Sequence, residues 1–83
     1  MSLSEQLRGL SENGDNKLDV LIEIALFKPD SHTTAVRSNA AGTKVIYTNY
    51  KGNEETYWPS DWTVLRNREV TLAALEQAER GEA

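Results

Sequence analysis

A run of strand-favouring residues broken by a glycine turn most constrains the fold of this chain. Residues 43–62, TKVIYTNYKGNEETYWPSDW, hold five of the six aromatic residues together with several β-branched ones. Such side chains favour strands, and Gly and Asn are the residues that most readily adopt the positive φ of a tight hairpin turn. The segment therefore predicts a β-hairpin that turns at Gly52 and Asn53.

A two-residue loop at Gly52 and Asn53 would set the pairing of the two strands. The predicted pairs are Tyr50 with Glu55, Thr48 with Tyr57, and Tyr47 with Trp58. Side chains alternate between the two faces along a strand. One face would then carry Val45, Tyr47 and Trp58, and the other Ile46, Thr48, Tyr50 and Tyr57. Both faces would be partly apolar, so the sequence leaves open which one is buried.

Two helices are predicted before this hairpin. Ser2 followed by Glu5 is a capping-box pattern, which begins a short helix through three leucines. SENGDN, residues 11–16, breaks that helix, and the apolar spacing from Leu18 onward predicts a second one. Pro29 disfavours helical geometry at Lys28, so the second helix should end near Phe27. We expect a helical hairpin over residues 1–27.

The remaining segments complete an α+β pattern. Thr33 to Arg37 predicts a first strand and Thr43 to Tyr50 a second, so residues 33–65 should form a three-stranded antiparallel β-meander. The Ala, Leu and Glu content after Asn67 predicts a helix over residues 67–80 that ends before Gly81. The expected fold is a single α+β domain over residues 1–83, with two short N-terminal helices, the meander, and the C-terminal helix packed on one sheet face.

Size and composition exclude several classes of protein. A chain of 83 residues has little core to spare, and without cysteine it has neither a disulfide nor a thiolate ligand. It shows no basic and apolar signal sequence and no apolar run long enough for a membrane span. We therefore expect a cytoplasmic protein that does not enter the membrane.

No pattern indicates catalysis. His32 is the only histidine, and its neighbours Asp30 and Ser31 are too close in sequence to converge with it as a triad, so we expect an exposed loop histidine. Glu54 and Glu55 are strand neighbours that point to opposite faces. One histidine without cysteine excludes a structural zinc site, and no glycine-rich phosphate loop is present. We expect a binding protein rather than an enzyme, with no metal and no cofactor.

Two surfaces are candidates for binding. As a core, Tyr47, Trp58 and Trp62 would pack beneath the helices. As a surface, the hairpin would present a mixture of aromatic and basic side chains, namely Arg37, Lys44, Tyr50, Lys51 and Tyr57. The second surface is acidic and comprises Glu69, Glu76, Glu79 and Glu82 of the C-terminal helix, with Glu12, Asp15, Asp19 and Glu23 near the N-terminus. Such a face is usually only solvated, and the alternative is that it binds a basic site on a partner.

Two long stretches of the chain resemble small proteins encoded in phage and prophage genomes. LSEQLRGLSENGDNKLDVLIEIAL has their short leucine helix, Gly/Asp break and Leu-Asp-x-x-Ile segment, here Leu18, Asp19 and Ile22. AGTKVIYTNYKGNEETYWPSDWT, followed by an Ala/Leu-rich helix, is similar to them as well. The resemblance implies an accessory protein that works in a bacterial host by stoichiometric binding. Its target would be a host protein complex, such as a CRISPR effector or another defence system, which it inhibits or redirects.

A narrower resemblance supports a different class of function. VIYTNYKGNEETYWP looks like the strand-turn-strand of WYL-type domains, which are SH3-like ligand-binding barrels, although the Trp-Tyr-Leu signature is absent. It implies a module that binds a small ligand or single-stranded nucleic acid through Tyr50, Tyr57, Lys44 and Lys51. Residues 37–68 carry five basic and three acidic groups, which only weakly favours phosphate. A third alternative is a subunit that completes its core as a homodimer.

Overall fold

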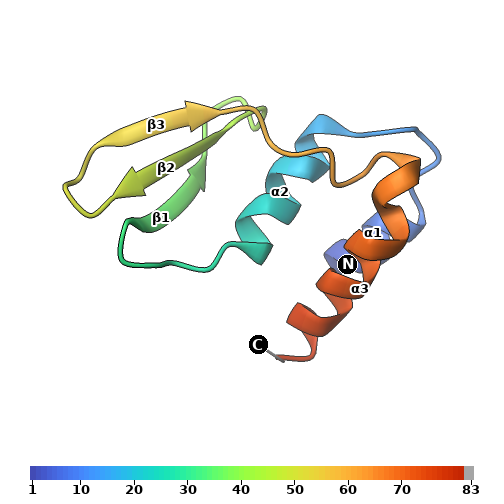
Figure 1. Cartoon of the computed structure of the whole chain (residues 1–83). Coiled ribbons are helices and arrows are strands. Elements are labelled where there is room, and N and C mark those ends of the chain that lie inside the picture. Colours follow the sequence, from blue (N-terminus) through green and yellow to red (C-terminus); the bar gives the residue numbers. More distant parts are fainter. Residues whose placement is uncertain (82–83) are drawn as a thin grey trace.

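The computed structural model describes residues 1–81, and it confirms the predicted α+β class (Figure 1). The chain forms, in order, α1 (Leu3–Arg8), α2 (Asn16–Leu26), β1 (Thr33–Ser38), β2 (Val45–Asn49), β3 (Glu54–Tyr57), the 3₁₀ helix η1 (Leu65–Asn67) and α3 (Arg68–Glu79). Residues 58–64 form neither helix nor strand and lead from the sheet to the last helix.

The helix ends follow the capping residues that the sequence predicts, with one exception. Ser2 and Glu5 form the capping box of α1, and the Asp15 side chain accepts a hydrogen bond from the Leu18 amide at the start of α2. Phe27 leaves helical geometry directly after Leu26, as expected from the nearby proline. Asn67 is the exception, because its side chain donates to the Asp61 carbonyl (2.6 Å) instead of capping α3.

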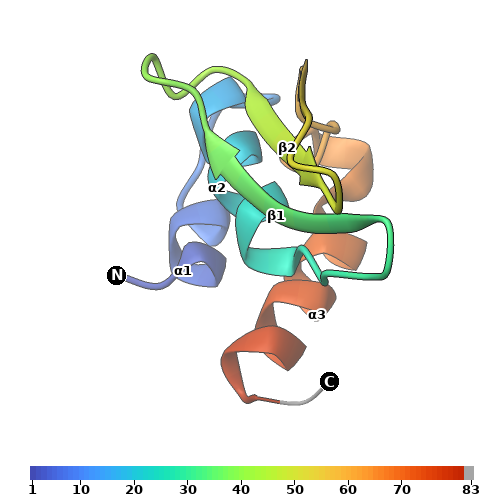
Figure 2. The same cartoon turned by 90° about the vertical axis from the view of Figure 1, so that its left-hand side faces the viewer.

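Helix α2 lies at the centre of the molecule. One side of it contacts β1 and β2, and the other side contacts α1 and α3 (Figures 1 and 2). Helix α2 therefore lies between α3 and the sheet. Leu7, Leu18, Ile22 and Leu75 form the buried core between the three helices, and Trp62 packs against it as predicted. Trp58, predicted as the other core tryptophan, is 66% exposed instead.

The three strands form an antiparallel meander in the order β1-β2-β3, but the predicted pairing of the hairpin is wrong. Tyr47 pairs with Glu55 rather than Trp58, and Thr48 pairs with Glu54 rather than Tyr57. The cause is the turn, which spans three residues. The Asn49 amide donates to the Asn53 carbonyl (2.9 Å), and the Gly52 amide, at φ 84°, donates to the Asn49 carbonyl (2.9 Å).

This register moves Tyr57 to the other face of the sheet. Compared with the prediction, β3 is displaced by an odd number of residues along β2, which exchanges the two faces of its side chains. Tyr57 lies across from Val45, and Glu55 across from Tyr47, on the face that α2 covers. Glu54 and Thr56 lie on the opposite face, on which no helix within residues 1–81 packs.

A candidate binding pocket beneath strand β3

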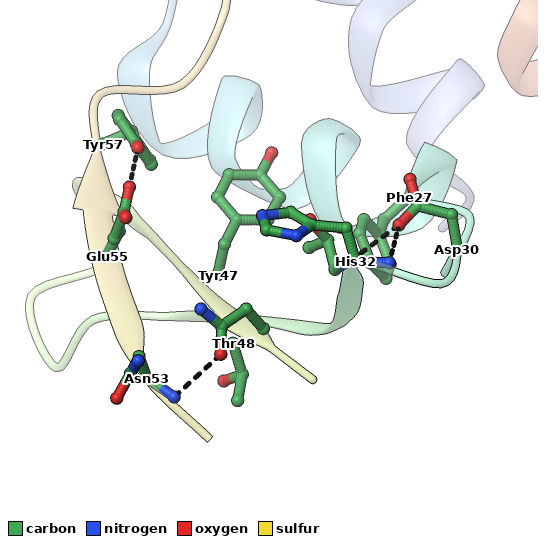
Figure 3. Close-up of a pocket in the computed structure, with 10 residues that line it drawn as sticks. Phe27, Asp30, His32, Tyr47, Thr48, Asn53, Glu55 and Tyr57 are labelled. Atoms are coloured by element: carbon green, nitrogen blue, oxygen red, sulfur yellow. Dashed lines mark hydrogen bonds between the residues drawn. The ribbon is translucent and has the colours of Figure 1, made fainter. Parts of the chain in front are cut away.

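Helix α2 does not cover the full width of the sheet. It contacts β1 and β2, and no helix of the described chain contacts β3. The inner face of β3 is therefore open, and a cavity of about 370 Å³ lies between it and the loop that follows α2 (Figure 3). Its size lies at the lower end of the range of small-ligand pockets.

Three aromatic rings line this cavity. Tyr47 lies in the middle, with its ring centroid 6.0 Å from that of Phe27 and 5.9 Å from that of Tyr57. The planes are tilted by 50° and 58°, a geometry that aromatic pairs favour over a flat stack. Phe27 follows α2 directly, and the two tyrosines come from neighbouring strands. The pocket thus joins the end of the central helix to the inner face of the sheet.

Glu23 of α2 holds the middle ring in place. Its carboxylate accepts hydrogen bonds from the Tyr47 hydroxyl, the Ser60 amide (2.9 Å) and the Trp62 indole nitrogen (2.8 Å). Burial alone would raise the pKa of Glu23, but these hydrogen bonds outweigh it and the pKa is lowered. Burial and the same carboxylate raise the pKa of Tyr47, which keeps its phenol neutral. Glu23 thus does not lie on the solvated acidic face that its sequence position predicts, and these contacts are not evident from the sequence.

Two carboxylates stand on opposite sides of Tyr47 (Figure 3). The Asp30 Oδ1 atom, in the loop after α2, accepts from the amides of His32 (2.8 Å) and Thr33 (2.7 Å). These hydrogen bonds lower the pKa of Asp30 and keep it ionised. On β3, the Glu55 carboxylate accepts from the Tyr57 hydroxyl, which raises the pKa of that phenol. Among the described residues that line the pocket there is neither lysine nor arginine.

His32 connects the pocket to the tip of the hairpin. It is exposed, as predicted, and its ring centroid lies 6.0 Å from that of Tyr50. The Tyr50 amide also donates to the His32 carbonyl (2.9 Å), so the loop after α2 and the hairpin turn are held together. Tyr50 is 60% and Tyr57 49% exposed, which leaves aromatic surface accessible both at the hairpin turn and in the pocket.

The five residues of the predicted aromatic and basic surface do not share one face. Arg37 forms an ion pair with Glu54 on the outer face of the sheet, whereas Tyr57 lines the inner pocket. The Lys44 ammonium lies 4.5 Å from the Trp58 ring centroid, and that of Lys51 lies 5.6 Å from the Tyr50 centroid. The basic side chains are therefore dispersed, and of the two tyrosines only Tyr57 lies in the pocket, where its hydroxyl bonds Glu55.

The predicted acidic surface of the last helix is largely part of the fold. Glu76 forms an ion pair with Arg8, and Glu79 accepts hydrogen bonds from the amide (3.1 Å) and hydroxyl (2.6 Å) of the buried Ser4. Both residues thereby join α3 to α1, whereas Glu69 is exposed. Glu82 lies outside the described residues.

The acidic residues near the N-terminus also serve the fold. Asp19 is buried and accepts a hydrogen bond from the Thr63 amide (2.8 Å), and the Asp15 amide donates to the Thr63 hydroxyl (2.6 Å). Burial raises the pKa of Asp19, although the hydrogen bonds from Thr63 oppose the shift. Of this group, Glu12 is exposed, whereas Asp15, Asp19 and Glu23 all connect α2 to the segment after the sheet.

Two further findings concern the described part of the chain. Within residues 1–81, no three His, Asp or Glu side chains are placed so that they could hold a metal ion. None of the helices there is both long and apolar enough to cross a membrane.

No protein family, curated protein or solved structure was found to match this chain.

Proposed function

We propose that this is a non-enzymatic binding protein that captures a partner protein at the pocket beneath β3. The observation that carries the proposal is the uncovered inner face of β3, where Phe27, Tyr47 and Tyr57 line an open cavity. Aromatic side chains are enriched at protein interfaces, where they bury a large area at a small loss of conformational freedom. Tyr50 and Trp58, near the two ends of the β2–β3 hairpin, add further exposed aromatic surface outside the pocket.

The resemblance to phage and prophage proteins suggests which partner to test first. Proteins of that kind work in a bacterial cytoplasm and often bind a host complex stoichiometrically. We therefore propose a host protein complex as the partner, with inhibition or redirection of that complex as the effect. An anti-CRISPR or other anti-defence role falls within this proposal.

The charge of the pocket favours a protein partner over nucleic acid. Single-strand platforms combine stacking rings with a positive groove that follows the phosphates. Here the rings lie beside Asp30 and Glu55, no lysine or arginine of the described chain lines the pocket, and Lys44 and Lys51 lie over rings outside it. Phosphates would meet negative charge where the stacking surface is accessible. A nucleic-acid module of the WYL type is therefore the less favoured function.

A pull-down from a lysate of the bacterial host tests the proposal. The wild type is compared with the double variant Tyr50→Ala/Tyr57→Ala, which removes exposed aromatic surface at the hairpin turn and in the pocket. Two control variants change exposed residues of α3, Glu69→Lys for the acidic helix and Val70→Ser for its apolar surface. We expect one host complex to be retained by the wild type and both controls and lost in the double variant. Retention by all variants, or no stable partner at all, would contradict the proposal.

A further inference from the structure

The carboxylates of Asp30 and Glu55 line the pocket beneath β3, and each has one oxygen that accepts no hydrogen bond from the described residues. Asp30 accepts its two hydrogen bonds through Oδ1, and Glu55 accepts its bond from Tyr57 through Oε2. The other oxygen of each carboxylate has no hydrogen-bond partner within residues 1–81. The rim of the cavity therefore has two acceptors available on opposite sides of Tyr47 (Figure 3).

The aromatic wall between these carboxylates suits a cation. The face of an aromatic ring is negative and attracts ammonium or guanidinium groups within about 6 Å. Elsewhere on the surface this attraction is already used, because Lys44 lies over Trp58 and Lys51 over Tyr50. The two cation–π pairs of the described chain thus lie outside the pocket, whose three rings have no cation of their own.

We propose that the pocket receives the guanidinium group of an arginine side chain on the partner protein, an assignment that rests on the proposed function. Arginine fits this combination better than lysine, because its planar, weakly hydrated group stacks on an aromatic ring and donates two N–H groups to one carboxylate. The rings of Tyr47 and Tyr57 contact its faces and Glu55 accepts its N–H groups, while the Asp30 carboxylate on the other side of Tyr47 adds negative charge to the same pocket. The interface is thereby anchored by one arginine, a residue type that often dominates binding energy.

The test uses short capped peptides and amide chemical shifts of the whole chain. The probes are a Gly-Gly-Arg-Gly-Gly peptide, the same peptide with citrulline, which is neutral and nearly identical in shape, and the same peptide with lysine. We expect the arginine peptide to shift the amides of Tyr47, Glu55 and Tyr57, and the citrulline peptide to bind much more weakly.

The chain contains a matched pair of variants for this test. Glu55→Gln removes the charge on the inner face of β3, whereas Glu54→Gln removes the charge of its neighbour on the outer face. Loss of a charge-assisted hydrogen bond should weaken arginine-peptide binding about tenfold in Glu55→Gln. Glu54→Gln should bind like the wild type. Higher salt should weaken binding to the wild type, because both carboxylates are exposed to solvent.

Several outcomes would overturn the assignment. These are citrulline or lysine peptides that bind as tightly as arginine, an arginine peptide that moves no pocket amide, or equal losses in Glu54→Gln and Glu55→Gln. An oligothymidylate that shifts the same amides would point to nucleic acid instead and overturn it too. If the lysate partner is lost in Tyr50→Ala/Tyr57→Ala but retained in Glu55→Gln, the assignment falls and the proposed function stands. Arginine-peptide binding without any captured partner supports the pocket chemistry and contradicts the proposed function.

Discussion

The Tyr47 hydroxyl on β2 donates a hydrogen bond to the Glu23 carboxylate on α2, and this contact joins the sheet to the central helix. Glu23 also accepts from the Ser60 amide and the Trp62 indole, so one carboxylate connects the helix, the sheet and the segment after the sheet. The same contact positions the middle ring of the candidate pocket. The stability of the fold and the proposed binding at the pocket therefore both depend on Glu23.

Replacing Glu23 with Gln should make stability less dependent on pH in the acid range. Because the folded-state pKa of Glu23 lies below its ordinary value of 4.5, its contribution is present above that value and is lost as pH falls through the folded pKa. At neutral pH the variant should be less stable by about 1–3 kcal/mol, from weaker hydrogen bonds at a partly buried site. Thermal unfolding followed by circular dichroism, at several pH values from neutral to acid, measures the stability of both proteins. The difference in stability between wild type and Glu23→Gln should become smaller as the pH falls.

The control for this experiment is Glu12→Gln, which removes an exposed carboxylate. Its stability should follow the wild type at every pH. Asp19 contributes with the opposite sign, because its pKa is raised above 3.8 and its ionisation at higher pH is unfavourable in the folded state. Since Asp19 is present in wild type and variants, its contribution cancels. A difference between Glu23→Gln and wild type that stays constant with pH would contradict the role of the Glu23 charge.

The register of the β2–β3 hairpin predicts specific proton contacts. Asn49 and Asn53 form the hydrogen-bonded pair next to the turn, so the next non-hydrogen-bonded pairs are Thr48 with Glu54 and Ile46 with Thr56. Their Cα atoms approach to about 4.5 Å, and strong Hα–Hα nuclear Overhauser effects should connect each pair. A strong effect between Thr48 and Tyr57 would instead indicate a two-residue turn.

Alternation and capping were sufficient to predict the elements but not their register. The hairpin, the capping box at Ser2 and the end of α2 all depend on residues near in sequence, and each was predicted. The register depended on whether Gly52 is the first residue of a two-residue turn or the third residue of a three-residue turn. The decisive contacts come from the Asn49 side chain, which accepts hydrogen bonds from the amides of Lys51 (2.9 Å) and Asn53 (3.0 Å). An asparagine three residues before the glycine was the available signal.

The site was harder to predict than the fold because it depends on which elements cover which strands. Tyr57 was identified from the sequence, but Phe27 and Glu23, which contact the neighbouring Tyr47, lie far from both tyrosines in sequence and reach them only through the packing of α2. The glutamates of α3 show the opposite case, in which residues predicted as a binding surface contribute to the fold instead. Their spacing is typical of a solvated face, yet Glu79 binds the buried Ser4, which no local pattern indicates.

Replacing Gly52 with Ala should destabilise the protein through the backbone alone. Gly52 has φ 84°, and an added Cβ would meet no atom within 4 Å, so a steric clash with neighbours is absent. The left-handed conformation is unfavourable for alanine by about 1–2 kcal/mol. Gly9→Ala is the matched control, since Gly9 has an ordinary φ of −83° and alanine there should be neutral or slightly stabilising. Equal unfolding midpoints in urea for the two variants would contradict the turn geometry.

Replacing Glu79 with Ala should loosen α1 from α3. The amide and hydroxyl of Ser4, which is only 4% exposed, would lose their shared acceptor. Unsatisfied buried donors cost about 1–3 kcal/mol, and hydrogen exchange at the Ser4 amide should accelerate. Gln77→Ala, an exposed change on the same helix, should alter stability by no more than about 0.5 kcal/mol. Unchanged exchange at Ser4 in the Glu79 variant would mean that this contact does not hold the two helices together.

Replacing Arg68 with Lys should weaken the attachment of the α1–α2 loop even though the charge is kept. The Arg68 guanidinium donates to the carbonyls of Leu10 (2.7 Å), Glu12 and Thr63 (2.9 Å), and thereby joins the loop after α1 to the start of α3. A lysine ammonium cannot reproduce this planar fork, so we expect a loss of about 1–3 kcal/mol in the free energy of unfolding by urea. Arg66→Lys should change little, because Arg66 makes only an exposed ion pair with Asp61. If Arg68→Lys and Arg66→Lys unfold at the same urea concentration, the planar geometry of the Arg68 guanidinium does not contribute to stability. The loop between α1 and α2 would then be held by contacts other than those of Arg68.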